Sequence, residues 1–131
     1  MLDLKKVCRE IETAALEAGE FIQKESVGFD IKMTETKGLN NFVSYVDKGS
    51  EKLLVKKLGN ILPEAGFLAE EGTSKKVGLK YSWVIDPLDG TTNFLHGLHP
   101  YAISIGLKEE DEIVAGVVHE VSGNETFTAW K

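Results

Sequence analysis

Residues 83–94 of the chain read WVIDPLDGTTNF, and this stretch decides the local fold. An apolar run ends there in two carboxylates, Asp86 and Asp89, and a Gly-Thr-Thr-Asn segment follows. Pro87 has no N–H to offer a neighbouring strand, and it favours an extended conformation for the residue before it. Asp89-Gly90 is a strong turn dipeptide, because glycine tolerates positive φ. The stretch therefore predicts a strand that stops at residue 86, a tight turn and a short helix.

The same turn could bring together ligands for a cation and for an anion. A tight turn can swing the carboxylates of Asp86 and Asp89 to one side, with the carbonyl of Leu88 between them. Such an all-oxygen set suits Mg²⁺ or Mn²⁺, whereas zinc prefers nitrogen and sulfur ligands. Beyond Gly90, unpaired N–H groups and the helix dipole can hold a phosphate, with the Thr91 hydroxyl beside it. The alternative is an ordinary turn between a strand and a helix, with Asp89 as the helix cap.

Acidic residues also follow two apolar stretches earlier in the chain. Glu70 and Glu71 follow the stretch 66–69, which is typical of a short strand, and Asp47 follows the run 42–46. Taken alone, the acidic pair is typical of a solvated turn. Asp47 alone predicts the N-cap of the helix expected to begin near Ser50, worth about 1 kcal/mol to that helix.

Asp47, the Glu70-Glu71 pair and the stretch 83–94, in this order along the chain, resemble the motifs of the inositol monophosphatase family. Its members are magnesium-dependent and lithium-sensitive phosphatases. The resemblance implies that Glu70 is a metal ligand that helps to orient the attacking water, with Glu71 in a supporting role. It also implies that Asp47 hydrogen-bonds the Thr91 hydroxyl, a role that is compatible with capping. Lys37 matches a loop lysine of the family only loosely, and a solvated loop charge is the alternative.

The resemblance further implies direct hydrolysis of a small phosphate monoester, inositol monophosphate or a related sugar or polyol phosphate, by a metal-activated water. The metal ligands that it implies for Mg²⁺ or Mn²⁺ are Glu70, Asp86, Asp89 and the Leu88 carbonyl. The catalytic residues that it implies are Thr91, Asp47 and Glu70, and the substrate-binding residues are Gly90, Thr91 and Asp89. The alternative functions are a metal- or phosphate-binding module without turnover and a protein-interaction module.

The composition is that of a globular domain. The chain has 131 residues, of which 42% are hydrophobic and 27% charged, enough for one domain with a real core. Its net charge of -6 argues against nonspecific binding to nucleic acid or to an anionic membrane. No apolar run approaches the length of about 18 residues that a membrane span needs. The single Cys8 lies on the apolar stripe of the first helix, which indicates a buried structural thiol and a cytoplasmic protein.

The hydrophobic pattern predicts an α+β fold with two helices packed on a mainly antiparallel sheet. Apolar residues keep helical spacing from Leu4 to Ile22 and again over 50–62. We expect strands at 42–46, 66–69, 81–86, 101–107, 113–121 and 125–130, and a short helix after Thr91. The resemblance implies that this is the N-terminal part of a layered sugar-phosphatase sandwich, with residues 1–131 as its N-terminal domain.

The strand 101–107 does not alternate between apolar and polar residues, as a strand with one wet face should. One face carries isoleucines and a leucine, and the other carries Ala102, Ser104 and Gly106. Both faces therefore require cover, and two helices supply only one layer. The resemblance covers only the N-terminal half of a typical member, and the family's second signature, a Trp-Asp pair, is absent. We accordingly expect a truncated chain without the C-terminal domain, little activity on its own, and association into homo-oligomers.

Overall fold

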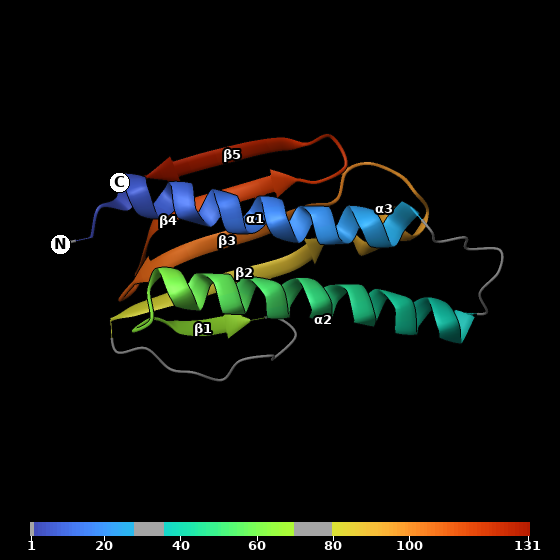
Figure 1. The fold of residues 1–131 in the computed structure, drawn as a ribbon, viewed down its shortest axis with the longest axis horizontal. Helices are drawn as coiled ribbons and strands as arrows, with labels where there is room; N and C mark the ends of the chain where they lie inside the picture. The colour runs from blue at the N-terminus through green and yellow to red at the C-terminus, as the bar shows by residue number, and fades with distance from the viewer. Residues whose placement is uncertain (1, 28–35, 70–79) are drawn as a thin grey trace.

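The computed structural model describes residues 2–27, 36–69 and 80–131. Two long helices come first, and a sheet interrupted by one short helix follows (Figure 1). The elements are α1 Leu4–Val27, α2 Thr36–Ile61, β1 Gly66–Ala69, β2 Tyr81–Asp89, α3 Thr91–Leu95, β3 Ala102–Glu109, β4 Glu112–Glu120 and β5 Glu125–Trp130.

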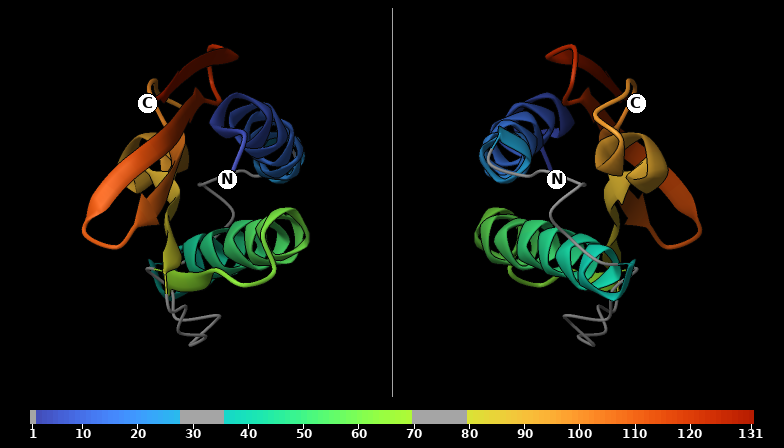
Figure 2. Two further views of the ribbon diagram at one scale, coloured as in Figure 1. Left: turned by 90° about the vertical axis from the view of Figure 1, so that its left-hand side faces the viewer. Right: turned by 90° about the vertical axis from the view of Figure 1, so that its right-hand side faces the viewer.

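The five strands form one sheet in the order β1-β2-β3-β4-β5. Only β1 and β2 run parallel, and every later pair is antiparallel. Helices α1 and α2 lie together on one side of this sheet (Figure 2). The predicted α+β fold, with two helices on a mainly antiparallel sheet, is confirmed.

The predicted strand at 42–46 is wrong, because these residues lie inside α2. Their β-branched and aromatic side chains favour a strand only weakly, and burial decides. Val46, Leu54 and Leu58 are fully buried at helical spacing on the face of α2 that packs against the sheet. One long helix therefore replaces the predicted strand and shorter helix, and Asp47 is not an N-cap.

Helix α1 packs closely on the sheet and on α2. A Cβ atom on Gly19 would lie 2.9 Å from two ring atoms of His119 on β4, and one on Gly49 would lie 2.5 Å from the Phe21 ring. The predicted burial of Cys8 is confirmed, and its thiol lies 3.8 Å from two strand carbonyls. Glycine at these two helix contacts is what lets the layers approach.

The two faces of the sheet differ in cover. On β3, Ile103, Ile105 and Leu107 are buried against the helices, while Ala102, Ser104 and Gly106 lie on the opposite face. That opposite face, which we call the open face, also carries Val84, Val118 and Phe127 at 37%, 41% and 58% exposure. It contains a hollow of about 660 Å³ lined mostly by apolar groups. Among the described residues, no second layer covers it.

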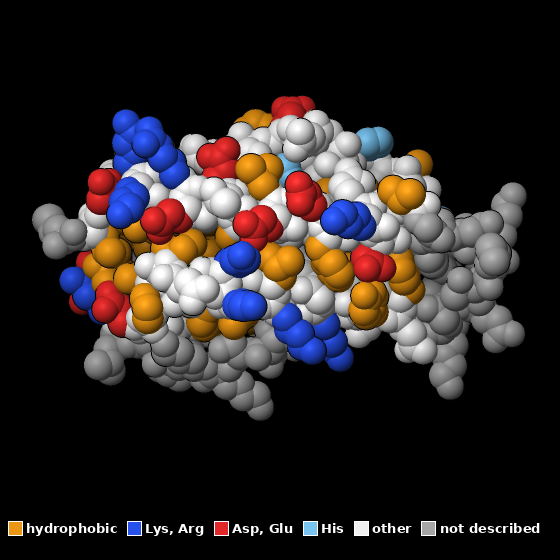
Figure 3. Space-filling model, in the orientation of Figure 1, with side chains coloured by type: hydrophobic (Ala, Val, Ile, Leu, Met, Phe, Trp, Pro, Cys, Tyr) orange, Lys and Arg blue, Asp and Glu red, His pale blue; other side chains and the backbone are white. Residues whose placement is uncertain are grey.

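The outer surface of the helices carries charged side chains (Figure 3), unlike the apolar open face. Acidic and basic side chains are interspersed over α1 and α2, with apolar groups between the two helices (Figure 3). Within the described residues, no helix combines the length and the apolar character that crossing a membrane requires.

The open face predicts that the isolated 131-residue chain associates with itself. Apolar patches beyond a few hundred Å² are rarely left bare on soluble monomers. We expect sedimentation velocity to show species heavier than the monomer that grow with concentration, and the double variant Val118→Ser, Phe127→Ser to shift the chain toward monomer. The control is Leu16→Ser on α1, where the leucine is 39% exposed but lies on the helix side. A wild-type monomer at every concentration would contradict the expectation.

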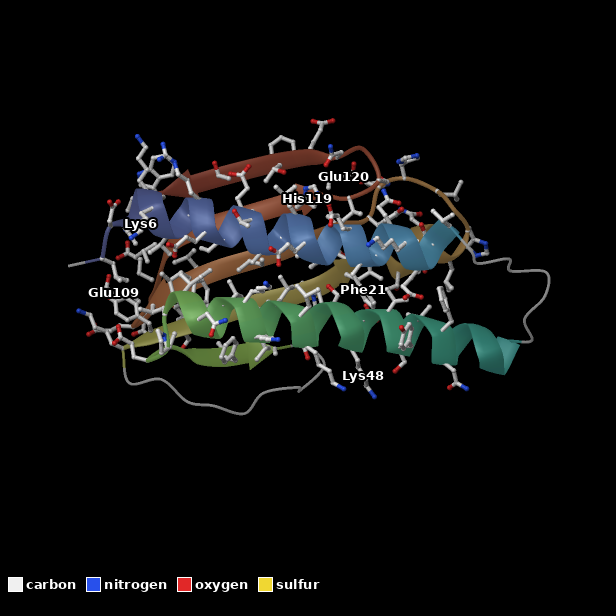
Figure 4. All side chains as sticks on the ribbon, viewed as in Figure 1. Lys6, Phe21, Lys48, Glu109, His119 and Glu120 are labelled. Carbon is white, nitrogen blue, oxygen red and sulfur yellow. The ribbon has the colours of Figure 1, made fainter. Side chains whose placement is uncertain are left out.

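His119 predicts a pH-dependent stability. Its ring is buried between β4 and α1, and Nδ1 lies 2.9 Å from the Thr126 hydroxyl (Figure 4). Burial lowers the pKa of His119, against the opposing effects of a backbone hydrogen bond at Glu125 and the charges of Glu120 and Glu12. The unfolded chain therefore binds a proton below about pH 6.5 that the folded chain takes up only at lower pH.

We expect the free energy of unfolding to fall as the pH drops below about 6.5, where the unfolded histidine becomes protonated first. Denaturant unfolding at several pH values measures this slope. His119→Gln should flatten the slope, whereas His96→Gln, at an exposed position, should keep it. Equal slopes in wild type and His119→Gln would mean that another group carries the dependence.

Candidate functional site

The end of β2 carries a β-bulge that keeps two carboxylates out of the core. Asp86 pairs with Ser104 on β3, but the next pair is Asp89 with Ala102, so β2 has one residue more than its partner. Bulges of this kind re-aim side chains at the ends of strands. Pro87 and the side chain of Leu88 are buried, while Asp86 is half-buried and Asp89 is exposed.

Asp86 is oriented by its own turn and faces the open side of the sheet. The Leu88 N–H donates to Asp86 Oδ1 at 3.3 Å. Asp86 also lines the 660 Å³ hollow of the open face, together with Val84 on the same strand. The carboxylate therefore lies at one end of an otherwise apolar surface.

Gly90 makes the sharp turn from β2 into α3. Its φ is 87° and its ψ is 40°, the left-handed conformation that glycine adopts most readily. An added Cβ would lie 2.7 Å from the carbonyl oxygen of Pro100. The same oxygen accepts a 2.9 Å hydrogen bond from the Asn93 side-chain amide. Within the described residues, no side chain caps α3, so its first N–H groups, beginning at Thr91, point away from the helix with no side-chain acceptor.

Helix α2 holds this turn from inside the protein. The Ser50 hydroxyl donates a buried 2.9 Å hydrogen bond to the carbonyl of Pro87. The Phe42 ring stacks on the Phe94 ring of α3, with centroids 5.9 Å apart and planes 12° apart. Both contacts come from one helix, so the position of α2 sets the position of the turn.

Asp47 lies on the buried side of α2, near these contacts. It is 8% exposed, and Ser50 follows one turn later on the same face. Lys48, the next residue, is exposed, and its side chain extends outward from α2 (Figure 4). The sequence interpretation missed that Ser50 and Glu51 are fully buried too. Their helical spacing with Leu54, inside the helix predicted over 50–62, was the available signal.

Glu70, Glu71 and Lys37 lie outside the residues whose side chains the structure describes. Within the described part, no group of three histidine, cysteine, aspartate or glutamate side chains is close enough to hold a metal. β1 ends at Ala69, whose register partner on β2 is Ile85, the residue before Asp86. The available oxygen donors are the two aspartates and the backbone of the turn, a set whose chemistry suits a hard divalent cation.

Comparison with known proteins gives one consistent result. Residues 3–131 match the family described as the inositol monophosphatase family. The chain is 39% identical over 117 residues to the putative Nus factor SuhB of Neisseria meningitidis, covering 88% of this chain and 45% of that protein. It is 36% identical over 116 residues to the inositol-1-monophosphatase of Mesorhizobium japonicum, covering 88% of this chain and 44% of that protein. The chain thus spans about 45% of the length of these curated relatives.

Solved structures agree with the sequence match. The extragenic suppressor protein SuhB from Bartonella henselae superposes with a TM-score of 0.81 at 34% identity, over 95% of this chain and 48% of that one. The inositol monophosphatase from Anabaena superposes with a TM-score of 0.75 at 27% identity, over 98% of this chain and 43% of that one.

The turn predicts a large cost for adding a methyl group at Gly90. Gly97 is the matched control, because its φ is also positive, at 65°, but an added Cβ would meet nothing within 4 Å. Gly97→Ala should cost about 1–2 kcal/mol of unfolding free energy from backbone strain alone. Gly90→Ala should cost roughly 1–3 kcal/mol more, because its Cβ meets the Pro100 carbonyl. Denaturant unfolding measures both, and equal losses would contradict the close contact.

Proposed function

The chain belongs to the inositol monophosphatase family, and we propose that it forms the metal- and phosphate-binding half of a phosphatase. The proposed reaction is hydrolysis of a small phosphate monoester, inositol monophosphate or a related polyol phosphate. One observation carries the proposal: at the bulged end of β2, Asp86 and Asp89 stay outside the core beside the left-handed Gly90. The resemblance to a protein named inositol-1-monophosphatase supports the choice of substrate class.

The proposed cation is Mg²⁺, with Mn²⁺ as a substitute and Li⁺ as an inhibitor. Glu70, which follows Ala69 in the sequence, would hold a first cation together with Asp86 and the Leu88 carbonyl, and Asp86 and Asp89 would share a second. When bound, such a cation lowers the pKa of a water molecule and stabilises negative charge on the phosphate and the leaving oxygen. The end of β1 beside β2 supports this choice of Glu70, because Ala69 pairs with Ile85.

The chain's own groups would position the reactants. The N–H groups of Gly90 and Thr91 would bind phosphate oxygens, because α3 begins there without a side-chain cap among the described residues. The Thr91 hydroxyl would orient the attacking water, and the buried Asp47 would accept a hydrogen bond from that hydroxyl. Ser50 supports this arrangement, since its hydrogen bond to Pro87 connects the Asp47 face of α2 to the turn.

We propose that a second half completes the enzyme, with residues 1–131 as the N-terminal domain. The chain spans about 45% of its curated relatives, and a second cation would need a further aspartate from the remainder. That remainder would also select the alcohol part of the substrate. We call this chain joined to such a second half the full-length protein. A cytoplasmic location is part of the proposal, which the single free and buried thiol Cys8 supports, and so is association into homo-oligomers.

Asp86→Asn tests the metal assignment in the full-length protein. Asp86 is the carboxylate proposed to serve both cations, so its loss should remove most phosphate release from inositol monophosphate with Mg²⁺. The unfolding free energy should change little or rise, because neighbouring carboxylates repel one another without metal. A variant that keeps more than roughly a tenth of the wild-type rate, about 1.4 kcal/mol of barrier at most, would overturn the assignment.

Thr91→Ala tests the role of the hydroxyl, with Thr92→Ala as its neighbour control at an exposed position. We expect Thr91→Ala to lower the rate on the order of 10²-fold while its Mn²⁺ affinity stays near that of wild type. Thr92→Ala should leave both quantities unchanged. Isothermal titration with Mn²⁺ beside the rate assay measures them, and a joint loss in Thr91→Ala would make Thr91 a metal ligand instead.

A protein-interaction role is the second candidate, because several relatives carry the name Nus factor SuhB. A pull-down from extract with the full-length protein, compared with Asp86→Asn, tests whether partners bind independently of the metal site. Partners that bind both forms equally, without phosphate release by wild type, would favour this candidate over the enzyme.

A further inference from the structure

Ser104 is the direct cross-strand neighbour of Asp86. The two residues are register partners on β3 and β2, so their side chains lie on the same face of the sheet. Both line the hollow of the open face, where the next pair on this face is Val84 with Gly106. The hollow is otherwise almost entirely apolar, so a hydroxyl and a carboxylate stand together at its polar end.

We propose that Ser104 is a positioning residue for Asp86, and that its hydroxyl donates a hydrogen bond to the Asp86 carboxylate in the metal-bound protein. This inference rests on the proposed function of Asp86 as a metal ligand. Cross-strand partners have Cβ atoms about 4.5–5.5 Å apart. A serine hydroxyl can therefore reach the facing carboxylate at the usual O–H···O distance of about 2.7 Å.

The carboxylate needs such a partner because one hydrogen bond leaves it free to rotate. Within the described residues, Asp86 accepts one hydrogen bond, from the Leu88 N–H to Oδ1. A donor from β3 would fix the plane of the carboxylate from the neighbouring strand while leaving lone pairs for a cation. Hydrogen bonds to ligating carboxylates commonly control metal affinity. Ser104 would thus act through Asp86 without touching the substrate.

The competing explanation is that position 104 requires only a small side chain and makes no use of the hydroxyl. Ala102 and Gly106 flank it on the same face of β3, and this row leaves room for another layer to approach. Under that explanation alanine would serve as well as serine, as it already does at position 102. The two explanations differ in whether the Ser104 hydroxyl has a role, so removing that hydroxyl by substitution distinguishes them.

The experiment measures Mn²⁺ affinity by isothermal titration, without substrate, in the full-length protein. Ser104→Ala removes the hydroxyl, and Ser104→Thr keeps it. Ser82→Ala is the matched control, because Ser82 lies on the same face of β2 and is half-buried as well, but pairs with Lys108. Ser104→Cys, of similar size but a weak donor, carries the test if Ser104→Ala does not fold. Rates at several Mg²⁺ concentrations with inositol monophosphate accompany the titrations.

We expect Ser104→Ala to weaken Mn²⁺ binding roughly 10-fold and to raise the Mg²⁺ concentration for half-maximal rate, with little change in KM for the substrate at saturating Mg²⁺. Ser104→Thr should stay within about threefold of wild type in Mn²⁺ affinity, by the same hydrogen-bond argument. Ser82→Ala should match wild type. Equal affinity in Ser104→Ala and wild type, or equal losses in Ser104→Ala and Ser104→Thr, would overturn the inference. A wild-type protein that binds Mn²⁺ but releases no phosphate would overturn the proposed function while leaving the Ser104 inference intact.

Discussion

The hydrogen bond from Ser50 to the Pro87 carbonyl is the interaction on which the rest of the candidate site depends. It is buried, and it connects the long helix α2 to the one place where β2 leaves its regular pairing with β3. The bulge at that place turns Pro87 and Leu88 inward, so the two flanking aspartates remain outside the core. Gly90 then reverses the chain in a conformation that, beside the Pro100 carbonyl, only glycine can adopt without overlap.

The two faces of the sheet differ in what they contact. The face toward α1 and α2 holds the core, and the open face holds apolar side chains with Asp86 and Ser104 at one end. The surface that lacks cover is thus the surface that carries the proposed metal ligand. A layer packed on the open face would exclude water from that ligand, which strengthens every electrostatic interaction there. In this fold, the proposed second half would bury the apolar face and complete the site in one step.

The sequence predicted well where the signal is local and failed where burial against distant residues decides. The meander of β3, β4 and β5 and the short helix after Gly90 follow from apolar stretches and the turn residues between them. The run 42–46 misled the interpretation, because its β-branched residues are compatible with a strand. In α2 this run is helical, and Val46 is buried at helical spacing with Leu54 and Leu58. Asp47 consequently moved from a predicted helix cap to a buried position in the middle of α2.

By itself, the sequence determined the chemistry of the turn: two carboxylates, a proline between them and a glycine behind them. The predicted end of the strand at residue 86 is wrong, because β2 continues through Pro87 to Asp89 and a bulge accommodates the proline. The tertiary structure alone decided which side of the sheet these groups face and what lies opposite them. Ser104 stands beside Asp86, and Gly19 against His119, because of strand register and helix packing. Those pairings join residues far apart in the chain, and their free energy comes from burial across the whole domain, so no local pattern contains them.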